Sequence, residues 1–265
     1  MSVKLIPVLM AAGFICACGG GGGTSDTTVT DTVQDTTSAE VEVEACTLTA
    51  DLTDQYFHVD HLYVQEPGGQ DGVLADTLTI LWNTQISKDQ LIIMFHVTKH
   101  DKETGELWFE AGSAVKHPSG NYQMIANPAP EVIKMELDGC RIQSTEDAVL
   151  KVYPDLVTTP IPVVKLRVDA AFTADGASIN QGGTLIGGIC TTDAHAINFK
   201  LVETQPGCTN FYNFVTDVGL IPNETDLVCP LGGMDGFSFK GTFDAHRISN
   251  VEAGTITVNR EFSCS

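Results

Sequence analysis

Apolar residues after position 45 recur in short runs that are separated by turn residues. The run LIIMFHV at 91–97 is apolar on both alternating faces, which predicts a buried central strand. Gly105 is available for a positive φ in a turn at 101–105, and Asp138-Gly139 fits a two-residue hairpin turn. We therefore expect strands over 56–64, 91–97, 107–114, 132–137, 140–143, 163–173, 184–190, 237–245 and 254–258.

Helical periodicity is confined to a few segments. Apolar residues recur at i, i+4, i+7 and i+8 from Leu74, which predicts one amphipathic helix over 73–86. A second helix, capped near residue 192, is expected to extend to Leu201, and a third to cover 211–218. The pattern predicts a mainly β fold with a few short helices, an α+β chain whose antiparallel sheets pack on one another or on those helices.

The charge balance restricts the partners of this chain. Its 265 residues include 14 Lys and Arg against 34 Asp and Glu, a formal charge of −20. Of this, −15 belongs to residues 46–265 and −6 to residues 18–45. Nucleic acids and anionic lipid surfaces both attract Lys and Arg, so the charge argues against either as an electrostatic partner.

The N-terminus has the features of an export signal. Residues 1–17 carry Lys4 and then a 13-residue apolar run, which is too short to cross a membrane but fits a secretory signal peptide. The motif ICAC that ends at Cys18 resembles the lipobox of bacterial lipoproteins. This resemblance implies cleavage before Cys18, loss of Cys16 with the signal, and a lipid anchor on Cys18. Gly19 follows the cysteine, where an Asp would resemble the signal for retention in the inner membrane. The resemblance therefore also implies the outer membrane, at the periplasmic face or the cell surface.

Residues 18–45 form a linker by composition. After Cys18 come five successive Gly, then many Thr, six acidic residues and no Lys, Arg or aromatic residue. Such a segment cannot bury enough apolar surface to fold, so we expect a disordered tether. Random-coil scaling gives its 27 residues after Cys18 a mean reach of roughly 30 Å.

The remaining cysteines predict three disulfides. Six are left once Cys16 and Cys18 are set aside, an even number in an exported chain. A proline-punctuated stretch at 153–162 divides the folded part into two similar halves, 46–157 and 158–265, with two and four cysteines. We predict that each half closes its own bridges. In the first half the predicted bridge is Cys46–Cys140. The second half allows several pairings, of which we favour Cys190–Cys264 together with Cys208–Cys229.

Histidines are the main candidates for chemistry. Five of the seven lie in the first half. Because His58 and Asp60 would share one strand face, and His96 and His100 another, two adjacent strands could bring three or four ligands together for zinc or a similar divalent metal. On a regular strand, however, His58 and His61 would point to opposite faces. Partly exposed histidines with hydrogen-bond partners are the simpler interpretation. The metal alternative comprises His58, His61, His96 and His100.

No motif in the sequence identifies a reaction. The sequence contains no G-x-S-x-G motif, no P-loop and no EF-hand loop. We therefore expect a lipid-anchored, exported, β-rich binding or structural module rather than an enzyme, with a protein as its partner and no cofactor. One alternative is a carrier of lipid or another hydrophobic ligand, in a cavity lined by 73–86 and 91–97. The other is a metal-dependent enzyme that uses the first-half histidines.

Overall fold

The computed structural model describes residues 46–67, 72–201, 204–258 and 264. Over these residues the chain is mainly β with three short helices, as predicted. The helices are α1 (Val73–Ser87), α2 (Thr191–Ala196) and α3 (Phe211–Asp217). The strands are β1 (Tyr56–Glu66), β2 (Ile93–Asp101), β3 (Glu106–Lys116), β4 (Tyr122–Ile125), β5 (Glu131–Asp138), β6 (Arg141–Ser144), β7 (Ala148–Val152), β8 (Ile161–Ala171), β9 (Ser178–Cys190), β10 (Asn198–Phe199), β11 (Thr209–Asn210), β12 (Gly236–Ile248) and β13 (Val251–Ile256).

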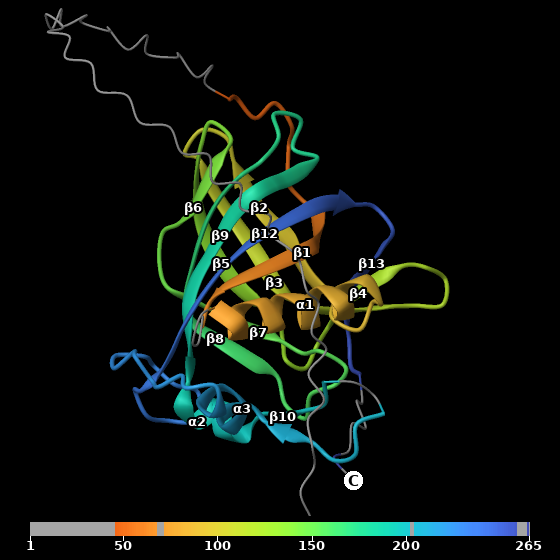
Figure 1. Ribbon diagram of the computed structural model, residues 1–265. Helices are drawn as coiled ribbons and strands as arrows, with labels where there is room; N and C mark the ends of the chain where they lie inside the picture. The colour runs from red at the N-terminus through yellow and green to blue at the C-terminus, as the bar shows by residue number, and fades with distance from the viewer. Residues whose placement is uncertain (1–45, 68–71, 202–203, 259–263, 265) are drawn as a thin grey trace, which may run out of the picture. The chain divides into compact units, whose positions relative to one another are not determined.

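Eight of these strands close into one antiparallel barrel (Figure 1). The strand order is β1-β2-β3-β5-β6-β8-β9-β12, and β12 pairs with β1 to complete the ring. Barrel strands that follow one another along the chain are neighbours in space, which defines an up-and-down barrel. Strands from both predicted halves therefore share one barrel, within a single compact unit that spans Glu44–Ser265.

The other elements lie outside the ring. β4 extends the sheet from β3, β13 pairs with β4 in parallel, and β7 pairs with β8. The helices α2 and α3 lie with β10 and β11 at one end of the barrel (Figure 1).

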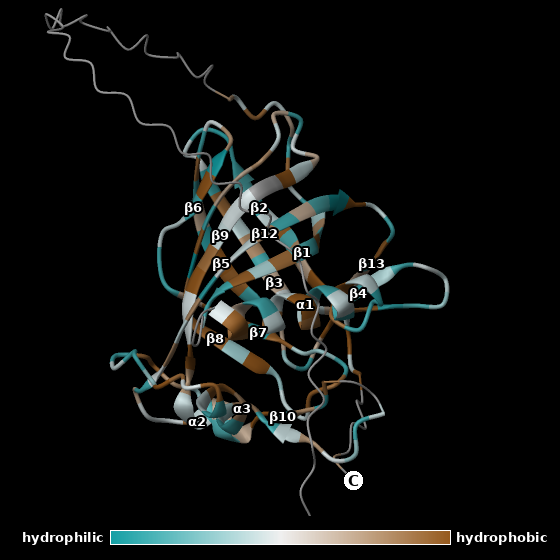
Figure 2. Ribbon diagram, viewed as in Figure 1, coloured by the Kyte–Doolittle hydropathy of each residue, from teal (hydrophilic) through white to brown (hydrophobic). Residues whose placement is uncertain are grey.

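Alternation along the strands fills the barrel with apolar side chains. On β12, every second residue from Phe237 to Ala245 is buried, while Ser238, Lys240, Thr242 and Asp244 between them are more exposed. Figure 2 shows hydrophobic positions recurring within the barrel strands, while hydrophilic residues are common in the connecting loops. The core is thus inside the barrel, and the polar residues of the same strands face outward.

The helix α1, found where the sequence predicts it, completes the hydrogen bonding of β1. The pairing of β1 with β2 covers only Tyr56 to His58. Further along, Asn83 accepts a hydrogen bond from the Leu62 amide at 2.9 Å and donates to its carbonyl at 3.1 Å. Thr79, one helical turn earlier, accepts from the Val64 amide at 2.8 Å. Four residues of a helix and two residues of a strand both span roughly 6 Å. Asn83 and Thr79 are therefore spaced to reach the backbone of Leu62 and Val64, which are two residues apart on β1.

The structure confirms one predicted disulfide and corrects two. Cys46–Cys140 is present, with a sequence separation of 94. The second half does close its own bridges, but the favoured pairing was wrong. Leu227 packs on β9 and β12 against Gly188 and Gly236, which brings the following loop to the end of β9. The observed pairs are accordingly Cys190–Cys229 and Cys208–Cys264.

Two local predictions also need correction. Asp138 pairs with Arg141, so the β5–β6 turn is Gly139-Cys140 and not Asp138-Gly139. The helix α2 ends at Ala196, because the next residues turn into β10 and pair with β11. Leu201 therefore lies beyond the helix.

The predicted signal peptide at 1–17, the tether at 18–45 and the lipidated Cys18 lie outside the described residues. None of the helices among the residues that the structure describes has the length and apolar character needed to cross a membrane.

Candidate functional site

The outer surface of β1 and β12 carries three histidines and two aspartates. A β-bulge in β1 between Val59 and His61 adds one residue relative to β12 and shifts the alternation. Val59 and Leu62 are consequently both buried, although they are three residues apart. The expectation that His58 and His61 face opposite sides was therefore wrong, because the bulge turns both toward the outside together with Asp60.

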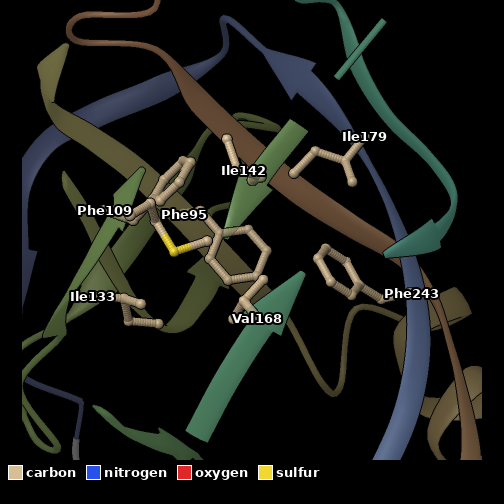
Figure 3. Close-up of a pocket in the computed structure, with 8 residues that line it drawn as sticks. Phe95, Phe109, Ile133, Ile142, Val168, Ile179 and Phe243 are labelled. Atoms are coloured by element: carbon tan, nitrogen blue, oxygen red, sulfur yellow. The ribbon is translucent and has the colours of Figure 1, made fainter. Parts of the chain in front are cut away.

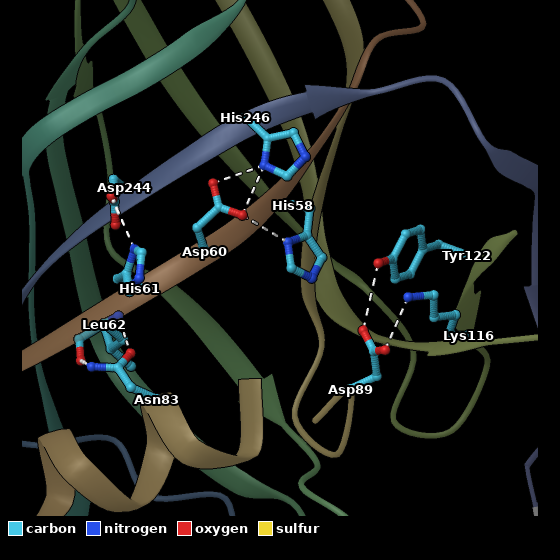
Figure 4. Close-up of polar contacts among 10 residues, drawn as sticks. All are labelled: His58, Asp60, His61, Leu62, Asn83, Asp89, Lys116, Tyr122, Asp244 and His246. Carbon is cyan, nitrogen blue, oxygen red and sulfur yellow. Dashed lines mark hydrogen bonds and ion pairs between the residues drawn. The ribbon is translucent and has the colours of Figure 1, made fainter. Parts of the chain in front are cut away.

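The carboxylate of Asp60 lies between two imidazole rings (Figure 4). His58 and His246 are opposite one another on β1 and β12. The Nδ1 atom of His246 lies 2.8 Å and 2.7 Å from the two Asp60 oxygens, and Nδ1 of His58 lies 3.3 Å from one of them. Because an ionised carboxylate can only accept, both Nδ1 atoms carry the hydrogen in these contacts.

Exposure changes steeply across this group. The side chain of His246 is 50% exposed, that of Asp60 33% and that of His58 only 8%. Burial lowers the pKa of His58, and this effect outweighs the hydrogen bond and the charge of Asp60, which raise it. The His58 ring is thus held neutral at neutral pH, while solvent reaches the group from the His246 side.

The second nitrogen of His58 has no hydrogen-bond partner among the described residues. Nε2 is fully buried, and the ring lies against that of Tyr122, with centroids 5.2 Å apart. Asp89 is close enough for its charge to raise the pKa of His58. Its carboxylate accepts hydrogen bonds from Lys116 at 2.9 Å and from Tyr122 at 3.5 Å (Figure 4).

A second histidine and aspartate pair adjoins the first group on the same face. His61 lies opposite Asp244, and its Nδ1 is 3.2 Å from a carboxylate oxygen. The other oxygen of Asp244 is buried and has no partner among the described residues. The His61 side chain is half exposed, so this pair is open to solvent.

The structure does not gather the four predicted metal ligands. His96 stacks on Tyr56 with ring centroids 4.1 Å apart. His100 is buried and accepts a hydrogen bond from the Leu52 amide at 3.1 Å. Among the described residues, only His58 of the four belongs to a group whose ligand atoms converge within 4.8 Å, and its partners are Asp60 and His246.

His246 was missed because no local signal marks it. It lies 186 residues from Asp60 along the chain, and only the pairing of β12 with β1 brings the two together. Asp60 and His58 were both named as candidate ligands, so the sequence indicated two of the three residues of the group.

Another convergence of candidate ligands has a structural explanation. Cys190, Asp193 and Cys229 also meet within 4.8 Å. Both sulfurs are engaged in one disulfide, so they are not thiolate ligands. Asp193 is buried, one of its oxygens has no partner among the described residues, and this burial raises its pKa.

The cavity that the described residues line inside the barrel offers almost no room for a ligand. This cavity is lined entirely by apolar side chains, which Figure 3 draws as sticks. The space open to the centre of a water molecule is about 10 Å³, which suffices for roughly one water. A second space, between α1 and the end of the barrel near α3, measures about 20 Å³ in the same terms. The lining residues of the barrel cavity are Phe95, Phe109, Ile133, Met135, Ile142, Val168, Ile179 and Phe243.

Comparison with known proteins gives no family for this chain: no protein-family model, no curated protein and no solved structure matches it. The geometry described above is therefore the basis for a functional assignment.

Proposed function

We propose that this chain is an exported, lipid-anchored binding module that presents ligand sites on the outer surface of a filled barrel. The observation that carries the proposal is the interior cavity of about 10 Å³. Small-molecule sites in proteins typically measure roughly 300–1,000 Å³, so the interior serves as a core and not as a container. The outer face of β1 and β12 instead brings polar side chains together within reach of solvent.

Export is supported by the cysteines and by the N-terminal sequence. All six cysteines that remain after Cys16 and Cys18 are paired in disulfides, which form and persist in oxidising compartments. In this proposal a lipid on Cys18, within the lipobox-like motif, is the anchor, and the acidic tether connects it to the folded part. Two or more acyl chains are needed for stable anchoring, and bacterial lipoprotein modification provides them.

Binding of apolar probes tests the use of the interior. The full chain is purified in detergent and then exchanged into a mild detergent. We expect ligand-observed NMR to show no saturable binding of benzene or palmitate to this sample. Phe95→Ala removes a lining side chain, and a cavity of that kind admits benzene in other proteins. This variant should bind benzene, which shows that the assay detects interior binding.

Two further variants keep the test decisive. Phe→Ala in a core costs roughly 3–5 kcal/mol, so Met135→Ala replaces it if that variant does not fold. Tyr63→Ala changes a side chain that is 42% exposed and should behave like the unmodified chain. Stoichiometric palmitate binding by the unmodified chain, weakened by changes at Phe95 or Met135, would establish a carrier and overturn the proposal.

A further inference from the structure

We propose that His58, Asp60 and His246 form a binding site for one borderline divalent transition-metal ion of the Zn²⁺ type, with open coordination positions toward solvent. This inference deepens the proposed surface-binding function by naming a ligand for the outer face. It uses only one of the histidines that the sequence singled out for metal binding.

The backbone determines which side chains meet. His58 and His246 lie opposite one another in the antiparallel pairing of β1 and β12, where side chains on the same face are roughly 5 Å apart at Cβ. Asp60 follows two residues later and is the extra residue of the bulge, with its side chain on the same outer face. The three ligands therefore come from two adjacent strands of the closed barrel, which is a rigid base for a metal site.

The distances suit a shared ion. The candidate ligand atoms all lie within 4.8 Å of one another, and the contacts to Asp60 measure 2.7 to 3.3 Å. Ligand atoms about 2.0–2.1 Å from a tetrahedral Zn²⁺ are separated by roughly 3.3 Å. Small side-chain rotations would thus place a metal where the two Nδ1–H groups now donate to the carboxylate. On binding, each neutral ring would adopt the tautomer with its hydrogen on Nε2, which frees Nδ1 for the metal.

The ligand chemistry selects the class of ion. Two imidazoles and one carboxylate match the three-ligand sets of catalytic zinc and non-haem iron centres, which leave further positions for water or substrate. Calcium and magnesium prefer all-oxygen sites and find only one carboxylate in this group. Exposure of His246 and Asp60 leaves the open positions accessible.

The surroundings resemble an outer coordination sphere. The ring nitrogen of a metal-bound histidine that does not bind the metal normally donates its hydrogen to a carboxylate, a carbonyl or water. With the metal at Nδ1 of His58, the hydrogen moves to Nε2, which is buried and has no partner among the described residues. Asp89 is the acidic neighbour whose charge acts on His58, and Lys116 and Tyr122 fix its position.

Cobalt and zinc titrations test the site. The full chain is purified in detergent, stripped with a chelator and titrated with Co²⁺ while visible absorption is recorded, then with Zn²⁺ by calorimetry. We expect one ion per chain, an absorption spectrum of four- or five-coordinate cobalt, and displacement of Co²⁺ by Zn²⁺. His246→Ala and Asp60→Asn should each weaken Zn²⁺ binding by at least about tenfold.

The controls separate this proposal from its alternatives. His195→Ala removes an exposed histidine that stacks on Tyr212 at the far end of the barrel and should leave binding unchanged. His246 and Asp60 are both partly exposed, so their variants should fold, and circular dichroism checks this. Absence of saturable binding, or binding that survives both substitutions, would overturn the metal site. The apolar-probe result would stand in either case, because it concerns the barrel interior.

Discussion

At the residue scale, Asn83 shows how a side chain can replace strand pairing. It makes two hydrogen bonds to the backbone of Leu62, where β1 has no pairing with β2. Asn83→Ala leaves both groups without a protein partner, and we expect it to lower the free energy of unfolding by about 1–2 kcal/mol. Urea denaturation measures the change. Thr84→Ala, next to it on the exposed side of α1, should change stability by less than about 0.5 kcal/mol. Equal effects of the two substitutions would contradict the role given to Asn83.

Gly188 shows why glycines cluster in β9. A Cβ on Gly188 would lie 2.7 Å from the side chain of Leu227. We expect Gly188→Ala to destabilise the protein by roughly 1–3 kcal/mol, the usual cost of overpacking. In the double variant with Leu227→Ala the clash is gone, so the two effects should be clearly less than additive. Thermal unfolding of the four proteins gives the coupling, and strict additivity would argue against the contact.

At the scale of elements, periodicity located the strands and α1 but not their irregularities. The aromatic and β-branched run at 56–64 predicted β1, yet nothing local distinguished the bulge at Asp60, which depends on the pairing of β1 with β12. The early end of α2 has a similar origin. Ala194, Ile197 and Leu201 have helical spacing, but the chain leaves the helix to form β10. Tertiary pairing outweighed local propensity in both cases.

In α2, we expect the buried Asp193 to lower the free energy of unfolding at neutral pH. Burial raises the pKa of Asp193 above its ordinary value of 3.8, so between the two pKa values the folded state retains a proton that the unfolded state has lost. Stability from this group is present at low pH and is lost as the pH rises through the folded pKa. Asp193→Asn should therefore be more stable than the unmodified chain at pH 7, by on the order of 1 kcal/mol.

The pH dependence separates this effect from a general one. The advantage of Asp193→Asn should shrink as the pH falls toward about 4. Asp169 is the matched control, because its hydrogen bonds with Arg141 lower its pKa. Asp169→Asn should lose stability at pH 7, the opposite sign. Denaturant titrations at several pH values measure both, and an Asp193→Asn difference that is constant with pH would contradict the assignment.

At the scale of the whole molecule, closure of the barrel creates the candidate site. Contacts such as that of His246 with Asp60 span 186 residues, and no spacing rule predicts a pairing of that length. The sequence did predict the β-rich class, the separate bridges of the two halves and His58 as a candidate ligand. The closed topology and the second histidine followed only once β12 was placed beside β1.

The proposed lipid anchor concerns the whole chain and has its own test. In a Gram-negative host fed a palmitate analogue, we expect the unmodified chain to incorporate the label and to sediment with the outer membrane. Cys18→Ser should abolish labelling, because the acyl acceptor is lost. Cys16→Ser should still be labelled, because that residue precedes the predicted cleavage site. Labelling of the Cys18→Ser variant would rule out the lipobox interpretation.

In the proposed function, the barrel interior is filled and the ligand binds on the outer surface. The most direct test of this proposal is diffraction from crystals of the full chain grown with Zn²⁺, with data recorded on both sides of the zinc absorption edge. We predict one strong anomalous peak between His58, Asp60 and His246, and an interior without density beyond its side chains. Ligand density inside the barrel, or no anomalous peak at these three residues, would contradict it.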